Sequence, residues 1–187
     1  MINQILTTMI GNYMITAFVI GVIIALIRVL NHRGQPTAEF ISGTFLNSFV
    51  FWAIGIAQTI NFVMHSVFGD YAAQSIGWAQ SPFQLELAMC SLGIGVMAFI
   101  LGRRTAPLIG KVALVTAVAI FGFGAAAGHI YQMLVNHDYA ANNTGLLLFS
   151  DIVINSVGLI LVIWHAMARR RETGTTDATV LAQPAHV

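Results

Sequence analysis

Two histidines and two carboxylic acids are the residues of this chain best suited to chemistry. His65, Glu86, His129 and Asp151 each lie near one end of a different apolar stretch, and that end of each stretch carries no Lys or Arg. We expect four helices to bring these side chains to one level, because polar groups inside a membrane bundle usually face its interior. Carboxylates at that level must be paired internally, protonated or neutralised by a bound cation.

Imidazole and carboxylate groups from facing helices are the donors that build metal sites in helical bundles. His65, His129, Glu86 and Asp151 are therefore candidate metal ligands, and zinc, iron and manganese are the ions that suit them. A divalent metal, or a haem held by His65 and His129, is the cofactor that this hypothesis implies. The Glu-x-x-His motif of di-iron bundles is absent from the sequence, so a di-iron site is not supported.

A second hypothesis is that the side chains at this level bind a small ligand or a proton. Glu86 and Asp151 would then bind or titrate, with Asn61 and Gln132 beside them. A third interpretation is a hydrogen-bonded network that only ties the helices together, as polar groups in membrane bundles often do. If Glu86 and His129 belong to one network, the effects of substituting them are expected to be non-additive.

Long apolar stretches must position these residues. The chain has 187 residues, of which 57% are hydrophobic and 8% are charged, whereas soluble domains carry about 25% charged residues. We predict helices over residues 5–30, 37–68, 81–101, 108–134 and 145–168, which approach or exceed the roughly 20 residues that span a bilayer. The sequence thus predicts an all-α integral membrane helical bundle of about five transmembrane helices in residues 1–171, followed by a disordered cytoplasmic tail over 172–187.

Local signals indicate where two of these helices begin. Thr37 is a predicted N-cap. Ser81, Pro82 and Gln84 have the spacing of a cap, a first helical position and a capping box. The second stretch is longer than the hydrocarbon core, so we expect it to be tilted, partly interfacial or broken near Gly55.

The basic residues predict the orientation of the bundle. All eight belong to the same side of these stretches: Arg28, Arg33, Arg103, Arg104, Lys111, Arg169, Arg170 and Arg171. The positive-inside rule makes that side cytoplasmic, which places the N-terminus outside and the C-terminus in the cytoplasm. These residues form no stripe of the kind that binds nucleic acid, so the expected surroundings are the lipid bilayer.

Small residues in the fourth stretch suggest a partner. Gly124 and Gly128 have the small-x-x-x-small spacing at which helices in membranes pack closely. We expect them to serve a homo-oligomer or a contact with a partner membrane protein. Cys90 is the one cysteine of the chain, which excludes a disulfide framework within it.

Two short segments resemble the signatures of a bacterial family of small multi-spanning integral membrane proteins of unknown function. They are residues 76–86, Ile-Gly-Trp-Ala-Gln-Ser-Pro-Phe-Gln-Leu-Glu, and residues 128–132, Gly-His-Ile-Tyr-Gln. The resemblance implies a multi-pass protein of the bacterial inner membrane in which these two segments lie together, and it implies no activity. By architecture alone the chain is similar to small four-helix membrane proteins of quinone and sulfur metabolism, which adds a quinone to the candidate ligands.

The sequence therefore favours a small membrane protein with an outward-facing polar pocket and a binding or accessory role. It contains no nucleophile–base pair, phosphate loop or nucleotide motif, so whether it is an enzyme stays open. One alternative is a metal- or haem-dependent redox protein that uses His65, Glu86, His129 and Asp151. A second is an oligomeric proton-linked transporter, although we detect no inverted repeat of the kind that many carriers have.

Overall fold

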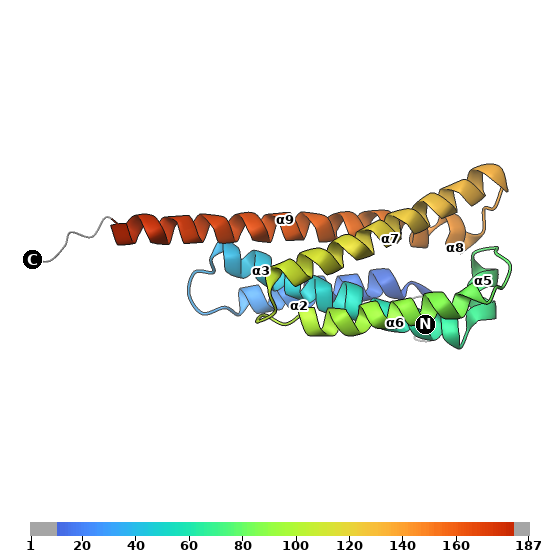
Figure 1. The fold of residues 1–187 in the computed structure, drawn as a ribbon, viewed down its shortest axis with the longest axis horizontal. Coiled ribbons are helices and arrows are strands. Elements are labelled where there is room, and N and C mark those ends of the chain that lie inside the picture. The colour runs from blue at the N-terminus through green and yellow to red at the C-terminus, as the bar shows by residue number, and fades with distance from the viewer. Residues whose placement is uncertain (1–10, 182–187) are drawn as a thin grey trace, which may run out of the picture.

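Five long helices run up and down in one bundle in the computed structural model of the chain (Figure 1). The structure describes residues 11–181, with side chains described as far as residue 174. The helices that are long and apolar enough to cross a membrane are Tyr13–Leu30, Ala38–Ser66, Phe83–Leu101, Leu108–Val135 and Ala141–Gly174. The predicted all-α bundle with five potential membrane spans is confirmed.

The second of these helices changes its winding along its length. It consists of α3 (Ala38–Ser48), the π-helical segment η1 (Phe49–Ile56) and α4 (Ala57–Ser66), which together we call the central helix. The remaining elements are α2 (Tyr13–Leu30), α5 (Gly69–Ser75), α6 (Phe83–Leu101), α7 (Leu108–Val135), α8 (Ala141–Thr144) and α9 (Leu146–Leu181). The irregularity expected near Gly55 is thus a wide π-helical stretch and not a break in the helix.

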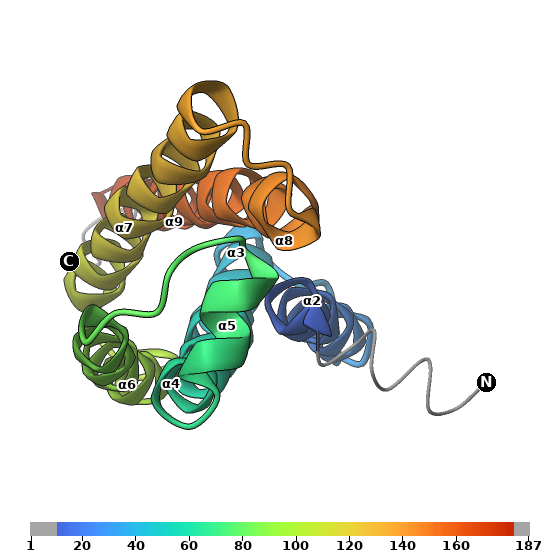
Figure 2. The ribbon, with the colours of Figure 1, turned by 90° about the vertical axis from the view of Figure 1, so that its right-hand side faces the viewer.

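The central helix lies in the middle of the bundle. In its most apolar window 67% of the residues are buried, against 17–39% in the other four membrane-spanning helices. Seen end-on in Figure 2, α2, α6 and α9 surround it, and α7 lies beside α9. Its Leu46, Val50 and Ile54 form the apolar core with Val115 of α7 and Leu161 of α9.

Close packing of α6 against the central helix depends on small residues. A Cβ atom at Gly55 would lie 2.8 Å from the Phe99 ring, and one at Gly95 would lie 2.9 Å from Thr59 Oγ1. Thr59 Oγ1 in turn donates to the carbonyl of Gly55 at 2.8 Å. The hydroxyl thereby satisfies a backbone acceptor in the π-helical segment, where the regular hydrogen-bond ladder is altered.

One predicted helix start is confirmed and the other is wrong in detail. Thr37 Oγ1 accepts a backbone N–H of the first turn of α3 at 3.1 Å, so it is the predicted N-cap. The capping box of α6 does not form. α6 begins at Phe83, whose N–H donates to Ser81 Oγ at 3.2 Å, while the Gln84 side chain bonds to His65 on the central helix. The Gln84 side chain, which the capping box requires, is instead engaged in a hydrogen bond between helices.

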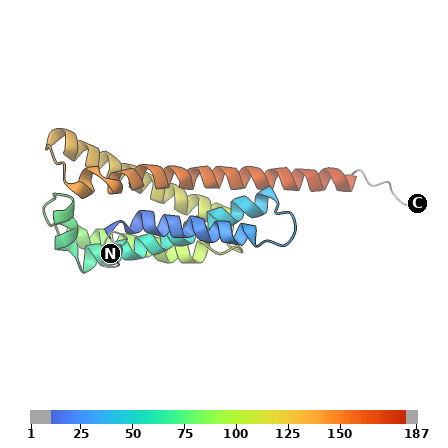
Figure 3. The ribbon, with the colours of Figure 1, turned by 180° about the vertical axis from the view of Figure 1, so that it is seen from behind.

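α9 extends past the other helices at one end of the bundle (Figures 1 and 3). We call this the basic end, because the Lys and Arg residues belong to it. α9 continues to Leu181, beyond the end at Ala168 that the sequence predicted. Contacts with α3 support this extension: Arg169 Nε lies 3.3 Å from Glu39 Oε1, and Glu172 Oε1 accepts the Glu39 N–H at 3.0 Å.

Parts of two predicted segments lie outside the described residues. The predicted tail over 172–187 begins as a continuation of α9, and its residues 182–187 are not described. The first predicted helix started at residue 5, and its residues 5–10 are likewise outside the described range.

The close approach of α7 to α9 occurs at Gly122, and not at the predicted pair Gly124 and Gly128. A Cβ atom at Gly122 would overlap the Asn155 side chain. At Gly124 no described atom lies within 4 Å of such a Cβ, and at Gly128 the nearest is Trp78 Cη2 at 3.9 Å. Gly124 and Gly128 thus serve no close helix contact within the described part of the chain, and their role in an oligomer stays a prediction.

Gly122→Ala is expected to destabilise the bundle by about 1–3 kcal/mol, because a methyl group there forces Asn155 out of its position. Unfolding of the purified protein by SDS titration measures the effect. Gly124→Ala on the same helix is the matched control and should leave stability unchanged or slightly raised, since alanine is the better helix former. Equal effects of the two substitutions would contradict the assignment of Gly122 as the contact point.

Candidate functional site

A pocket of about 320 Å³ lies between the helices at the end opposite the basic end. We call it the far pocket. Residues of α2, α4, α6, α7 and α9 line it, together with α5 and the loop that follows α5. Its walls are mainly apolar and include Met14, Met64, Leu87 and Phe121. The side chains with polar atoms in its lining are Tyr13, Gln58, Asn61, His65, Tyr71, Ser75, Trp78, His129, Asn142 and Asp151. A mainly apolar cavity of this kind with a few polar groups is typical of small-molecule sites.

His129 is held by contacts on three sides. Its Nδ1 shares a 2.7 Å hydrogen bond with Asn143 Oδ1, and its Nε2 lies 3.9 Å from Asp151 Oδ2. The Trp78 ring lies against it with 5.4 Å between ring centroids. Asn143, which is fully buried, donates through Nδ2 to the carbonyls of Asp138 at 2.8 Å and of His129 at 3.4 Å. These contacts fix the imidazole with its Nε2 toward Asp151.

Asn61, in the wall of the far pocket, joins three helices. Tyr13 Oη donates to Asn61 Oδ1 at 2.5 Å, and Asn61 Nδ2 donates to Ser91 Oγ at 2.8 Å. α2, the central helix and α6 are thereby linked in one chain of hydrogen bonds. Both ends of the Asn61 amide therefore have protein partners.

Gln58 is the polar group of the far pocket that lacks a partner. Its side chain lies one turn before Asn61 and is 6% exposed. Its Oε1 is buried and has no hydrogen-bond partner among the described residues. A buried acceptor without a partner costs about 1–3 kcal/mol, so its retention calls for an explanation.

The structure brings three of the four predicted residues to this pocket and leaves one out. His65, His129 and Asp151 line it, as does the predicted Asn61. Glu86 lies exposed on α6, where the following residue Leu87 faces the pocket instead. Successive residues of a helix point about 100° apart, and on α6 the rotation places Leu87 and not Glu86 toward the pocket.

Gln132 also departs from its predicted place. It is half-buried and not part of the pocket lining, and its Oε1 accepts a hydrogen bond from the exposed Asn136 one turn later. Of the four predicted ligand-binding residues, Asp151 and Asn61 lie in the far pocket and Glu86 and Gln132 lie outside it, and their roles stay predictions.

The four candidate metal ligands do not form a metal site in this structure. Among the described residues, no group of three or more His, Cys, Asp or Glu side chains is placed to hold a metal ion. His65 Nδ1 is bonded to Gln84 Oε1, and Glu86 is exposed. Metal binding by His65, Glu86, His129 and Asp151 is accordingly not supported, and the haem alternative stays an untested prediction.

A family model matches residues 11–171, which include the whole lining of the far pocket. It is that of DUF6790, a family of unknown function. The chain belongs to this family. No curated protein and no solved structure matches the chain. The resemblance to an uncharacterised family is thus confirmed at that level, while the bacterial origin and the two signatures of this DUF6790 chain stay predictions.

The loop before α6 and the end of α7 lie together in the DUF6790 chain, as the resemblance implied. Besides the contact of Trp78 with His129, Gly77 lies against Asp138. Gly77 has φ +78, and a Cβ there would lie 2.6 Å from Asp138 Oδ1, so only glycine fits. Residues 76–78 thereby cover part of the far pocket.

Sequence reasoning missed three contributors to this site. They are Gln58, Trp78 and Asn143. The helical spacing already contained the signal for Gln58. The contacts of Trp78 and Asn143 with His129 depend on the conformation of the connections between the long helices, which residue spacing in the sequence does not predict.

His129→Ala and Asn143→Ala are expected to be non-additive in the free energy of unfolding, with a coupling of at least about 0.5 kcal/mol, because the two side chains share a buried hydrogen bond. A double-mutant cycle of thermal unfolding in detergent measures this coupling. The control cycle pairs His129→Ala with Glu86→Gln and should be additive, since Glu86 lies outside the site. A coupling in the control cycle as large as that with Asn143 would show that Glu86 belongs to the network after all.

Proposed function

We propose that this DUF6790 protein binds a small, mainly apolar molecule that carries an amine or hydroxyl group in the far pocket. The observation that carries the proposal is the buried Gln58 Oε1 that no described residue satisfies. A ligand with a hydrogen-bond donor would supply the missing partner.

The hydrogen bonds of His129 point to the same kind of ligand. Asn143 Nδ2 donates to two carbonyls, so its Oδ1 is the acceptor for the proton on His129 Nδ1. In the neutral imidazole Nε2 is then an acceptor, and it faces the Asp151 carboxylate at 3.9 Å. Two acceptors at this separation are satisfied when a donor group lies between them. The acceptor atoms of Gln58, His129 and Asp151 therefore favour a ligand with several hydrogen-bond donors.

The charge of the far pocket favours an amine over a hydroxyl. Asp151 is 6% exposed, and among the described residues that line the pocket there is no Lys or Arg. A buried carboxylate requires a compensating charge or proton, and an ammonium group provides the charge together with three N–H donors. The apolar walls would accommodate the hydrocarbon part, and the volume is within the usual range for ligand pockets.

The same groups discriminate between the two redox forms of a quinone. A quinone offers carbonyl acceptors, whereas its reduced hydroquinone offers hydroxyl donors. A pocket whose unsatisfied groups are acceptors therefore favours the hydroquinone. The narrower form of the proposal is therefore that the far pocket binds a hydroquinone, in a binding or accessory role.

The basic residues support a location and an orientation for this binding role. With Lys and Arg on the cytoplasmic side, the far pocket faces outward and the C-terminus lies in the cytoplasm. The resemblance to a bacterial family favours the inner membrane. We propose this arrangement together with the binding role.

Gln58→Leu should weaken the binding of donor-bearing probes about tenfold, since one buried hydrogen bond is lost. The probes are 4-propylbenzylamine, 4-propylphenol and propylbenzene, which share a hydrocarbon part and differ in the donor. Thermal unfolding of the purified protein in detergent, titrated with each probe, measures affinity. In the wild type the amine and the phenol should stabilise the protein more than propylbenzene does.

Two further variants make this experiment specific. Gln132→Leu is the matched control, because Gln132 is not part of the pocket lining, and it should leave the affinities unchanged. Asp151→Asn keeps the shape but removes the charge, so it should weaken the amine and spare the phenol. If propylbenzene stabilises the wild type as well as the other probes, the proposed class of ligand is wrong.

Labelling of single cysteines tests the orientation. In a Cys90→Ala background, Gln35→Cys at the basic end should react with a membrane-impermeant maleimide only after the cells are permeabilised. Tyr71→Cys at the opposite end should react in intact cells. Both replaced residues are exposed, so a reversed pattern would mean that the far pocket faces the cytoplasm.

A further inference from the structure

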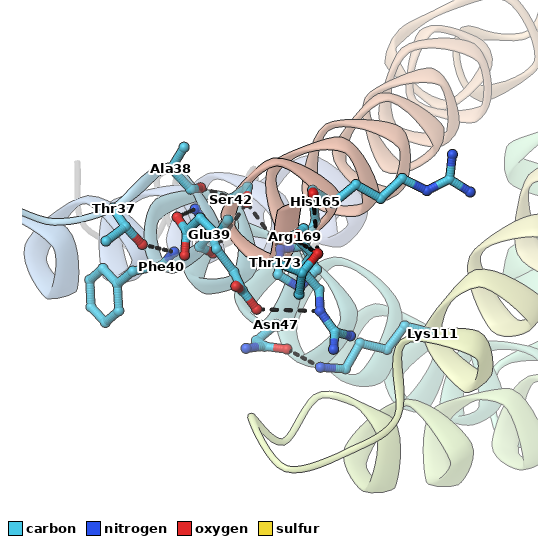
Figure 4. A network of polar contacts seen from close by, with 12 residues as sticks. Thr37, Ala38, Glu39, Phe40, Ser42, Asn47, Lys111, His165, Arg169 and Thr173 are labelled. Carbon is cyan, nitrogen blue, oxygen red and sulfur yellow. Dashed lines mark hydrogen bonds and ion pairs between the residues drawn. The ribbon is translucent and has the colours of Figure 1, made fainter. Parts of the chain in front are cut away.

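The basic end of the bundle contains a buried lysine that no carboxylate neutralises. Lys111, in the first turn of α7, is 3% exposed. Its Nζ donates to Asn47 Oδ1 of the central helix at 2.5 Å (Figure 4). No ion pair among the described residues includes it. An ammonium whose one acceptor is a neutral amide has no counter-charge and has two further N–H donors.

The carboxylates near Lys111 are already engaged. Glu39 pairs with Arg169 at 3.3 Å, and Glu172 Oε1 accepts the backbone N–H of Glu39 at 3.0 Å. Figure 4 shows this cluster beside the Asn47–Lys111 hydrogen bond. His165 of α9 shares a hydrogen bond with Ser42 Oγ at 3.0 Å. These contacts leave the charge of Lys111 to be balanced from elsewhere.

Lys111 borders a polar cavity of about 450 Å³, which we call the basic-end pocket. Arg104 lines it as well, with its guanidinium 5.3 Å from the centre of the Phe40 ring. Glu39, Arg169 and Glu172 also line this cavity, with both carboxylates engaged as described above. Pro107 and Leu108, where α7 begins, form another part of the wall. The N-terminus of a helix carries partial positive charge and free N–H groups, which add to the attraction for an anion.

A second cavity of about 800 Å³ adjoins the first, and Arg104 lines both. The charged residues among those that line this second cavity are Arg28, Arg33, Arg103 and Arg104, with no carboxylate among the described lining residues. Ile24, Phe51 and Trp52 form an apolar part of its wall.

Membrane orientation explains arginines at this end but does not explain the burial of Lys111. The positive-inside rule requires basic residues near the membrane surface, where long side chains reach water. Lys111 is instead enclosed between α7 and the central helix. A charge buried in a membrane bundle is costly and marks a functional site by default.

We propose that the basic-end pocket binds a phosphate group between the Lys111 ammonium, the Arg104 guanidinium and the first turn of α7. Phosphate oxygens accept from the free N–H groups of the lysine and match the planar fork of the arginine. The remainder of the ligand would extend into the second cavity, whose apolar wall suits a hydrocarbon chain. The phosphate comes either from the headgroup of an anionic phospholipid or from a soluble phosphate ester. This proposal does not depend on the far pocket.

Two probes test the site in the full-length protein purified in a zwitterionic detergent. The first is inorganic phosphate, with chloride at equal ionic strength as reference, and the second is phosphatidylglycerol, with phosphatidylcholine as reference. Thermal stability is the readout for both. Stabilisation by phosphate alone identifies a soluble ligand, and stabilisation by phosphatidylglycerol beyond that by phosphate identifies the headgroup. No difference between either probe and its reference would overturn the proposal.

Lys111→Met should reduce the affinity for the responsive probe at least about tenfold, as expected when a charged hydrogen bond is lost. Without the probe the same variant should be as stable as the wild type or more stable, because an uncompensated buried charge has been removed. Arg104→Gln should also weaken binding, and it provides a second test at an exposed position. Arg170→Gln is the matched control, since Arg170 is exposed and lines neither cavity. Equal effects of Lys111→Met and Arg170→Gln would mean that only the net charge matters, and the site would be rejected.

Discussion

The constraint on which this structure depends is that the central helix must cross the bundle with polar side chains that have almost no access to water. In such surroundings each polar group needs a partner, and the partners lie on different helices. Ser48 donates to the carbonyl of Gly21 in α2, and Asn47 accepts from Lys111 in α7. Ser42 bonds to His165 of α9, and Asn61 to Ser91 of α6. These hydrogen bonds fix the rotation of each of the four neighbouring helices relative to the central helix. Apolar packing alone would fix these rotations less specifically.

Gln58 is the exception to this pattern, and the exception identifies a site. Its neighbours Asn61 and Thr59 both have protein partners, whereas its Oε1 has none among the described residues. At the other end of the bundle Lys111 has a partner for hydrogen bonding but none for its charge. One central helix thus supports two incomplete polar environments of opposite kind. In the far pocket the Gln58 acceptor lacks a donor, and at the basic end Lys111 lacks an ion-pair partner among the described residues.

Much of the fold could be predicted from the sequence, because hydropathy, length and helix punctuation act locally. The start of α7 at Leu108 agrees with the prediction, and Thr37 caps α3 as expected. The departures arise where a tertiary contact competes with a local signal. Gln84 bonds to His65 instead of closing a capping box, and α9 continues past Ala168 where it is joined to α3.

The candidate site was predictable only in part. Depth along each span correctly suggested that His65, His129 and Asp151 lie at one level, since helical rise is regular. Depth gives no rotation about the helix axis, which is why the sequence predicts Glu86 in the interior although it lies exposed on α6. The buried Lys111 was assigned to orientation only, because the sequence does not distinguish a basic residue at the surface from one between helices.

The apolar core separates the two pockets and, in this conformation, provides no polar path for a proton or ion between them among the described residues. On the central helix, Asn47 and Gln58 are separated by the segment that contains Val50 and Ile54, about 15 Å of helix at the usual rise. Val115 of α7 and Leu161 of α9 close the same layer from the other side. A proton or ion would have to cross this layer without a hydrogen-bonded wire. The two ends can therefore hold ligands at the same time and at different electrical potentials, and a path through a single chain would require the core itself to open.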